Sequence, residues 1–187
     1  MDPVSFDRDI VTWFAGHRTP VLTTAARWAM ELGTGEPGMA VLAVLFVAAV
    51  VVGRWWRAGF TIGVSVLLAQ AVARALKQVV ARPRPPGDLA AVQVGAYSMP
   101  STVAAMTAAL AVALYAVVQW RRGFRPYAAA LLVTGLGVIA CAMVYLGAHW
   151  PTDVLAGWCV GALVGFIVIR LSRTVFRGLL LRAARSD

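Results

Sequence analysis

Three short polar segments interrupt an otherwise apolar chain, and each carries residues that can bind or attack an anion. The first runs from Lys77 to Pro86 and contains Lys77 and Arg84. Its prolines at 83, 85 and 86 end a helix and hold the following chain extended, so Lys77 on the last turn and Arg84 on the connector can point at one centre. This arrangement predicts a phosphate clamp.

The second polar segment, residues 98–103, opens an apolar run. A helix that starts at Pro100-Ser101-Thr102 leaves backbone N–H groups facing outward, where they and the Ser101 hydroxyl can hold an anion. The same residues are also common helix caps, and the segment taken alone is more typical of a cap.

The third polar segment, residues 145–153, contains a His and an Asp four residues apart. Pro151 suits the first turn of a helix, so Asp153 should lie near its N-terminus and within reach of His149. A carboxylate that accepts one imidazole N–H leaves the other nitrogen free as a nucleophile or base. An interfacial His and an acid favoured by the helix dipole are the simpler interpretations of the pair.

The elements that must position these segments are transmembrane helices. Of the 187 residues, 60% are hydrophobic and 13% charged, and the mean hydropathy is +0.77. A crossing helix needs about 20 mostly apolar residues. Five stretches lack charged residues, and a sixth, 20–35, carries only Arg27 and Glu31, which can pair across one helix turn. The five uncharged stretches are 38–53, 58–73, 89–120, 126–152 and 154–169.

We therefore predict an all-α integral membrane protein, a bundle of about six transmembrane helices in a single domain. Residues 1–19 would form an N-terminal interfacial segment, 20–172 the six spans and 173–187 a basic cytoplasmic tail.

No cleavable signal peptide is expected, because the chain opens with acidic residues instead of a basic region. Cys141 and Cys159 lie in apolar runs without metal-ligand spacing, so they are expected to be packing residues. Neither a metal nor a cofactor is expected.

The distribution of basic residues predicts the orientation in the membrane. Six spans would put both termini and twelve of the seventeen basic residues on one side, which the positive-inside rule makes cytoplasmic. The net charge of +9 then reflects topology and contacts with anionic membrane lipids, not nucleic-acid binding. Arg74, Lys77, Arg82 and Arg84 fall on the outer side against this trend, which favours an anion site there. Lys77 is also the only Lys of the chain.

From about the second span to the sixth, the chain resembles the type 2 phosphatidic acid phosphatase family, which includes bacterial lipid phosphatases and vanadium haloperoxidases. The first family motif is Lys, six residues, then Arg-Pro, and Lys77 with Arg84-Pro85 matches it in full. The third motif ends with His, three residues and Asp, which His149 and Asp153 match. The resemblance implies that His149 forms a phosphohistidine, that Asp153 is its partner, and that Lys77, Arg84 and Ser101, with Thr102, bind phosphate.

Four positions depart from the family pattern. Where the family has Pro-Ser-Gly-His, this chain has Thr102 and Val103, and Val103 cannot replace the His that protonates the leaving group. Where the family has Ser-Arg, this chain has Ala142 and Met143, so a phosphate-binding Arg is absent. The only other His, His17, is expected on the cytoplasmic side, about a membrane thickness away. Val103 and Met143 are expected to line the pocket and make its wall more apolar.

Losing a general acid costs about 10²–10⁴ in rate, and losing a charge-stabilising donor about 10²–10³ more. We therefore predict a protein of the bacterial inner membrane that binds a phospholipid or polyprenyl phosphate or diphosphate at its outer face, with hydrolysis lost or strongly attenuated. It would serve lipid recognition, transport or support of a membrane-enzyme partner. The alternative is an active phosphatase or phosphotransferase that uses His149, with diphosphates favoured because their leaving group needs no proton.

Overall fold

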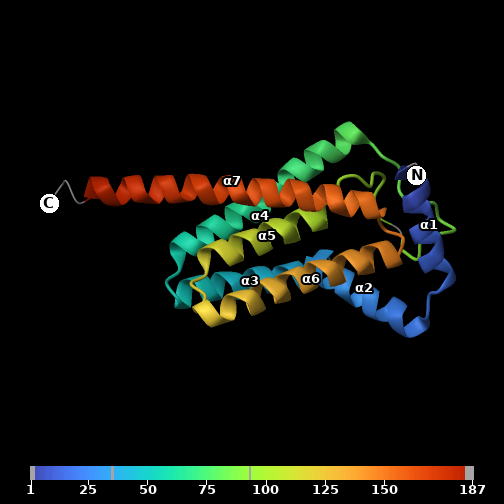
Figure 1. Ribbon diagram of the computed structural model, residues 1–187, viewed down its shortest axis with the longest axis horizontal. Helices are drawn as coiled ribbons and strands as arrows, with labels where there is room; N and C mark the ends of the chain where they lie inside the picture. Colours follow the sequence, from blue (N-terminus) through green and yellow to red (C-terminus); the bar gives the residue numbers. More distant parts are fainter. Residues whose placement is uncertain (1–2, 35, 93, 184–187) are drawn as a thin grey trace.

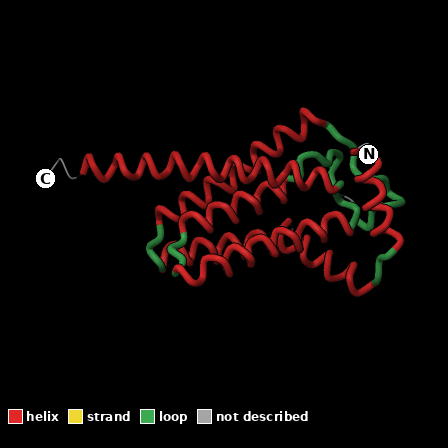
Figure 2. Tube along the Cα trace, viewed as in Figure 1, coloured by secondary structure: helices red, strands yellow, loops and turns green. Residues whose placement is uncertain are grey.

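The computed structural model describes residues 3–34, 36–92 and 94–183, and these are almost entirely helical (Figures 1 and 2). Within them the only β pairing is an isolated bridge between Pro83 and Tyr97. The helices are α1 (Pro3–Gly16), α2 (Pro20–Thr34), α3 (Glu36–Val52), α4 (Trp56–Val80), α5 (Thr102–Val117), the short 3-10 helix η1 (Arg122–Phe124), α6 (Arg125–Tyr145) and α7 (Pro151–Ala183).

Two ends of the bundle differ in their connections. The site end holds the long connection 81–101 between α4 and α5 and the short connection 146–150 between α6 and α7, with α1 lying across it (Figure 1). The opposite end holds the connections 53–55 and 118–124. Helix α7 begins at the site end and extends past the rest of the bundle at the opposite end, so the described chain finishes far from α1 (Figure 1).

The described helices have membrane-spanning character. Three are long and apolar enough to cross a membrane, namely residues 56–80, 122–145 and 151–178. Helix α5 has 16 residues, or about 24 Å, and is shorter than a hydrocarbon core of about 30 Å. Large apolar side chains such as Leu67, Leu131, Leu163 and Phe166 are exposed, as expected for surfaces that face lipid.

Small residues bring α5 and α7 close together. The buried face of α5 is made entirely of alanines, from Ala104 to Ala113. A Cβ placed on Gly157 would sit 2.5 Å from the Ser101 carbonyl oxygen, and one on Gly161 only 2.0 Å from the Ala105 carbonyl oxygen. Small residues permit this close backbone approach, which is a common way to join helices in lipid. The contact fixes the N-terminus of α5 beside that of α7.

The predicted topology of the N-terminal third is wrong. Helices α2 and α3 do not form a hairpin of two spans but follow one another from the site end toward the opposite end (Figure 1). With 15 and 17 residues, each is about 22–26 Å long, and like α5 each is shorter than a hydrocarbon core of about 30 Å, but α2 and α3 continue in one direction. The pair therefore takes the chain across once, and the predicted count of six spans is not confirmed. Helix α1 and the described end of α7 lie at opposite ends of the bundle, whereas both termini were expected on one side (Figure 1).

Smaller predictions also fail. Arg27 does not pair with Glu31 but donates to the Ala91 carbonyl oxygen at 2.9 Å. Residues 173–183 are not a separate tail, because α7 continues through them as one helix. Cys141 and Cys159 are exposed, so they are not packing residues of the core. A tertiary contact therefore explains the outcome for Arg27, and the rotation of α6 and α7 explains the exposure of the two cysteines.

Candidate phosphate site

A cavity of about 300 Å³ opens at the site end, where the last turns of α4, the connection 81–101 and the start of α5 meet. Three of its described lining residues are cations and none is acidic, so the cavity favours an anion. Lys77 and Arg84 were expected there, and Arg74, one turn before Lys77 on α4, joins them. The described lining residues are Arg74, Lys77, Gln78, Arg84, Gly95, Ala96, Tyr97 and Thr102.

The end of α4 and the backbone after it bring Lys77 and Arg84 together. Ala81 ends α4 in the left-handed conformation, with φ of 47°, and its N–H donates to the Lys77 carbonyl oxygen at 3.0 Å. The chain then folds back on itself, because Ser98 donates its N–H to the Arg82 carbonyl oxygen at 2.9 Å. This pairing sets Arg84 and Tyr97 on the same cavity wall.

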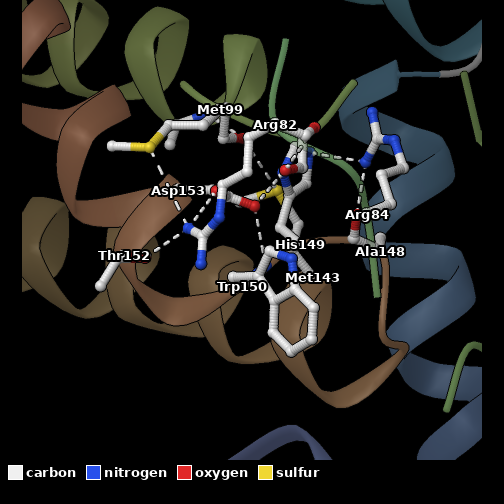
Figure 3. A network of polar contacts seen from close by, with 12 residues as sticks. Arg82, Arg84, Met99, Met143, Ala148, His149, Trp150, Thr152 and Asp153 are labelled. Atoms are coloured by element: carbon white, nitrogen blue, oxygen red, sulfur yellow. Dashed lines mark hydrogen bonds and ion pairs between the residues drawn. The ribbon is translucent and has the colours of Figure 1, made fainter. Parts of the chain in front are cut away.

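Arg84 connects the cavity to the predicted nucleophile. Its guanidinium donates to the carbonyl oxygens of Gly95 and Ala148, which fixes its orientation. Its Nη1 also lies 3.3 Å from Nε2 of His149 (Figure 3). Burial lowers the pKa of Arg84 from its usual value, but a guanidinium stays charged at neutral pH. The cation that would bind phosphate therefore touches the nitrogen that would attack it.

His149 and Asp153 lie next to each other, but Nδ1 of His149 has no hydrogen-bond partner among the described residues, so the predicted hydrogen bond is not observed. Nδ1 of His149 is 3.4 Å from Oδ2 of Asp153, and that oxygen accepts the Trp150 N–H at 2.8 Å. An arginine can only donate, so Nε2 must accept and the imidazole proton belongs on Nδ1, toward Asp153. Burial, reinforced by the charges of Arg84 and Lys77, lowers the pKa of His149. His149 is thus neutral at pH 7, with the Nε2 lone pair on the side of Arg84.

The sequence did not predict a buried network that holds Asp153 in place. Arg82 lies on the other side of His149 from Arg84 and does not line the cavity (Figure 3). Its Nη1 donates to Oδ1 of Asp153 at 2.8 Å and to the Thr152 hydroxyl at 2.6 Å, and its Nη2 donates to Oδ2 of Asp7 at 2.7 Å. Asp7 is fully buried and also accepts the Thr152 N–H at 3.0 Å. Helix α1 is therefore attached directly to the start of α7.

The sequence did not point to Asp7, because its N-terminal segment was expected at the membrane face opposite to the site. The same error applied to His17, which the structure places at the site end, after α1. His17 is nevertheless no substitute acid, because its ring stacks on Trp13 and its Nδ1 contacts the Trp13 carbonyl oxygen at 2.7 Å.

At the start of α5, Ser101 acts as a cap and Thr102 lines the cavity. The Ser101 hydroxyl accepts the Ala104 N–H at 3.3 Å, contacts Met143 Sδ at 3.5 Å and is fully buried. The Ser101 N–H is also taken, by the Asp153 carbonyl oxygen at 2.9 Å. In contrast, the N–H groups of Thr102 and Val103 have no partner among the described residues. They are the donors of this helix end that a ligand could use.

The expected apolar wall is not observed. Met143 is buried in a core cluster that also contains Ala104 and Val144, and Val103 packs against that cluster. Neither residue lines the cavity, and Ala142 is buried on α6. The substitutions therefore remove catalytic groups without covering the cations. Within the described part of the chain, no three His, Cys, Asp or Glu side chains are grouped so that they could hold a metal ion.

Two curated relatives resemble this chain. A decaprenylphosphoryl-5-phosphoribose phosphatase from Mycobacterium tuberculosis is 31% identical over 152 residues, which cover 80% of each chain. An undecaprenyl-diphosphatase from Sulfolobus acidocaldarius is 28% identical over 129 residues, which cover 65% of this chain and only 58% of that protein.

Two solved structures share the fold. The transmembrane PAP2 type phosphatidylglycerolphosphate phosphatase of Bacillus subtilis matches with a TM-score of 0.79 at 21% identity, covering 94% of this chain and 89% of the other. The LpxE protein of Aquifex aeolicus matches with a TM-score of 0.70 at 22% identity, covering 87% and 93%. The model of the PAP2 superfamily matches residues 58–177, which include every cavity residue as well as His149 and Asp153. With this match over more than half of its length, the chain belongs to the PAP2 superfamily.

Proposed function

We propose that this protein binds the phosphate or diphosphate headgroup of a polyprenyl lipid in the cavity at the site end, and that hydrolysis is lost or strongly attenuated. The observation that carries the proposal is the group of three cations, Arg74, Lys77 and Arg84, around a cavity without an acidic residue among its described lining. Both curated relatives are named as phosphatases of polyprenyl compounds, which favours a polyprenyl carrier over a phospholipid.

The attenuation rests on what the cavity lacks. The two positions at which the family pattern has a general acid and a third phosphate ligand carry Val103 and Met143, whose side chains pack into the core. The His149 nucleophile and Asp153 remain in place, so attack on phosphorus is possible in principle. The missing groups act on the transition state, whereas the three cations act on the bound anion as well. Binding is therefore expected to persist while turnover falls.

The orientation is part of the proposal. Nine basic residues of the described chain lie at or beyond the opposite end, from Arg54 to Arg182, and seven lie in α1, α2 and the site end. The positive-inside rule thus makes the opposite end cytoplasmic and turns the cavity toward the outside of the inner membrane. With the corrected topology, α1 lies outside and the end of α7 lies in the cytoplasm. A membrane-enzyme partner stays a prediction.

The second candidate is a working phosphatase or phosphotransferase, and two observations favour it. His149 is neutral, with Nε2 directed to Arg84, so it can form a bond to phosphorus while the bond from phosphorus to the leaving oxygen breaks. Tyr97 lines the cavity and carries a hydroxyl that can donate a proton to that oxygen. Water would then hydrolyse the phosphohistidine. A diphosphate would suit this route best, since attack on its terminal phosphorus expels the polyprenyl monophosphate, which leaves without needing a proton.

One experiment separates the two candidates. Purified protein in lipid nanodiscs is given a polyprenyl phosphate and, separately, a polyprenyl diphosphate, and both bound lipid and released phosphate are measured. We expect saturable binding and phosphate release far below ordinary enzymatic rates of about 1–10³ per second. Release at ordinary rates that is abolished by His149→Ala would establish the phosphatase, and loss of that release in Tyr97→Phe would identify its acid. Absence of binding to either lipid would overturn both candidates.

A further inference from the structure

A second and larger cavity, of about 1040 Å³, lies at the opposite end of the bundle. It is formed by the turn between α3 and α4, the first turns of α4, the end of α5 and the distal half of α7. Four of its described lining residues are arginines and none is acidic. The arginines are Arg54, Arg57, Arg173 and Arg177.

Among the described residues, no carboxylate forms an ion pair with these arginines. The described acidic residues after α3 begins at Glu36 are Asp88 and Asp153, and both belong to the site end. Accordingly, the described ion pairs all involve Arg82 or His149 at the site end. The guanidinium of Arg57 lies over the Phe176 ring at 5.5 Å, and Arg173 reaches the Ala116 carbonyl oxygen only at 3.4 Å. The described residues therefore leave these arginines without a counter-charge, which a bound anion would supply.

The remaining lining indicates an amphipathic ligand. Apolar residues such as Ala58, Val117 and Ile169 form an apolar wall of the cavity, which is also lined by the uncharged polar residues Thr61, Gln119 and Ser172. Trp55 and Trp56 stand at its edge with 64% and 59% of their surfaces exposed, as is usual for tryptophans at the level of lipid headgroups. A soluble anion would use the arginines but leave the apolar wall in water. A lipid with a negatively charged headgroup satisfies both parts.

We propose that this cavity is a binding site for an anionic phospholipid of the leaflet at the opposite end, separate from the phosphate site. The headgroup phosphate lies among the four arginines, and the first acyl carbons lie against the apolar wall. The proposal does not depend on the function of the site end. It differs from ordinary snorkelling of arginines, because snorkelling predicts a general preference for anionic membranes and not one retained lipid.

The test measures lipid retained by the purified protein. The full chain is reconstituted with phosphatidylglycerol or phosphatidylcholine, stripped with mild detergent and examined by native mass spectrometry. We expect one phosphatidylglycerol to persist, with no equivalent phosphatidylcholine. The double variant Arg57→Ala with Arg173→Ala should weaken retention by about thirtyfold, at roughly 1 kcal/mol per arginine. Soluble glycerol phosphate should not displace the lipid, whereas displacement would overturn the lipid assignment.

Matched controls distinguish a site from bulk charge. Arg121→Ala with Arg122→Ala removes the same charge from the same end but outside the cavity, and should leave retention unchanged. Equal losses in the two double variants, or equal retention of both lipids by the wild type, would overturn the proposal. Lys77→Ala at the site end should not alter phosphatidylglycerol retention, so failure of the proposed polyprenyl-phosphate function would be visible separately.

Discussion

Arginines lie over aromatic rings at both ends of the bundle, but the two ends differ in the hydrogen bonds that hold these arginines. At the site end Arg18, Arg82 and Arg84 each donate to carbonyl or carboxylate oxygens of other elements, and each is held by several bonds. At the opposite end Arg57, Arg125 and Arg170 lie over aromatic rings. Among the described residues, none of these three has a carboxylate partner. The site end therefore holds its guanidinium groups in fixed positions, whereas the opposite end leaves its guanidinium groups free to change position.

The difference shows how charge can serve two purposes in one membrane protein. Fixed cations cost little reorganisation when an anion arrives, which suits a site that must hold phosphate at a defined position near His149. Adaptable cations tolerate many headgroup positions and also determine topology. The difference can be tested by changing the links between helices, the cavity cations, the contact of α5 with α7 and His149.

The largest effect should come from the link between α1 and α7. Asp7→Ala removes the carboxylate that accepts hydrogen bonds from Arg82 and Thr152. Of the two carboxylates that pair with Arg82, only Asp153 then remains. Breaking a buried ion pair from one side costs about 3–5 kcal/mol, so the Tm of the detergent-solubilised protein should fall on the order of 10 °C. Asp9→Ala changes an exposed carboxylate of the same helix and should alter Tm little. Equal shifts in both variants would show that the network does not stabilise the fold.

The next effect concerns the cavity cations. Replacing Lys77 or Arg84 with Ala should weaken binding of a polyprenyl phosphate by about 1.5–3 kcal/mol, or roughly ten- to a hundredfold. The cations contact the bound anion whether or not chemistry follows, so His149→Ala should change affinity less. Equilibrium binding in nanodiscs measures both. Arg122→Ala at the opposite end serves as the charge-matched control, and a loss there as large as for Lys77→Ala would mean that the membrane surface, not the cavity, attracts the lipid.

A smaller effect is expected where α5 and α7 touch. A Cβ at Gly161 would meet the Ala105 carbonyl oxygen at 2.0 Å, whereas one at Gly165 would have its nearest neighbour, the Ala109 carbonyl oxygen, at 3.3 Å. Gly161→Ala must therefore push the helices apart, at a cost of about 1–3 kcal/mol, while Gly165→Ala needs only a slight adjustment. Thermal denaturation of the two variants side by side gives the comparison. If Gly165→Ala proved the more destabilising, the close contact would not be where the backbone places it.

The sequence predicted the site end better than it predicted the path of the chain. Lys77 and Arg84 line one cavity, and Arg84 reaches His149, which does not line it. These residues lie at the ends of long apolar runs, and such runs have few alternatives in lipid. The segment 20–53 was misjudged because residues 33–38 look like a turn, whereas the two flanking helices follow one another in the same direction. That single error moved α1 to the wrong face and hid Asp7. Whether a hydroxyl group caps the helix, as that of Ser101 does, or lines the cavity, as Thr102 does, depends on the rotation of α5. The spacing of residues in the sequence does not determine that rotation.

The smallest effect should appear in the pH dependence of stability. The pKa of His149 is lowered in the folded protein, so the unfolded chain takes up a proton at a higher pH than the folded chain does. Between these two pKa values the unfolded state binds more protons, and stability therefore falls as the pH drops below about 6.5. In His149→Gln this contribution is absent, so the fall in Tm between pH 7.5 and a pH of about 5.5 should be smaller than in the wild type by a few degrees. His17→Gln is the matched control, because it removes the other imidazole, which lies away from Arg84 and contacts only the ring and the carbonyl oxygen of Trp13 among the described residues. A His149→Gln protein that loses as much stability on acidification as the wild type would show that His149 is already protonated beside Arg84, and the neutral nucleophile of the phosphatase candidate would be lost with it.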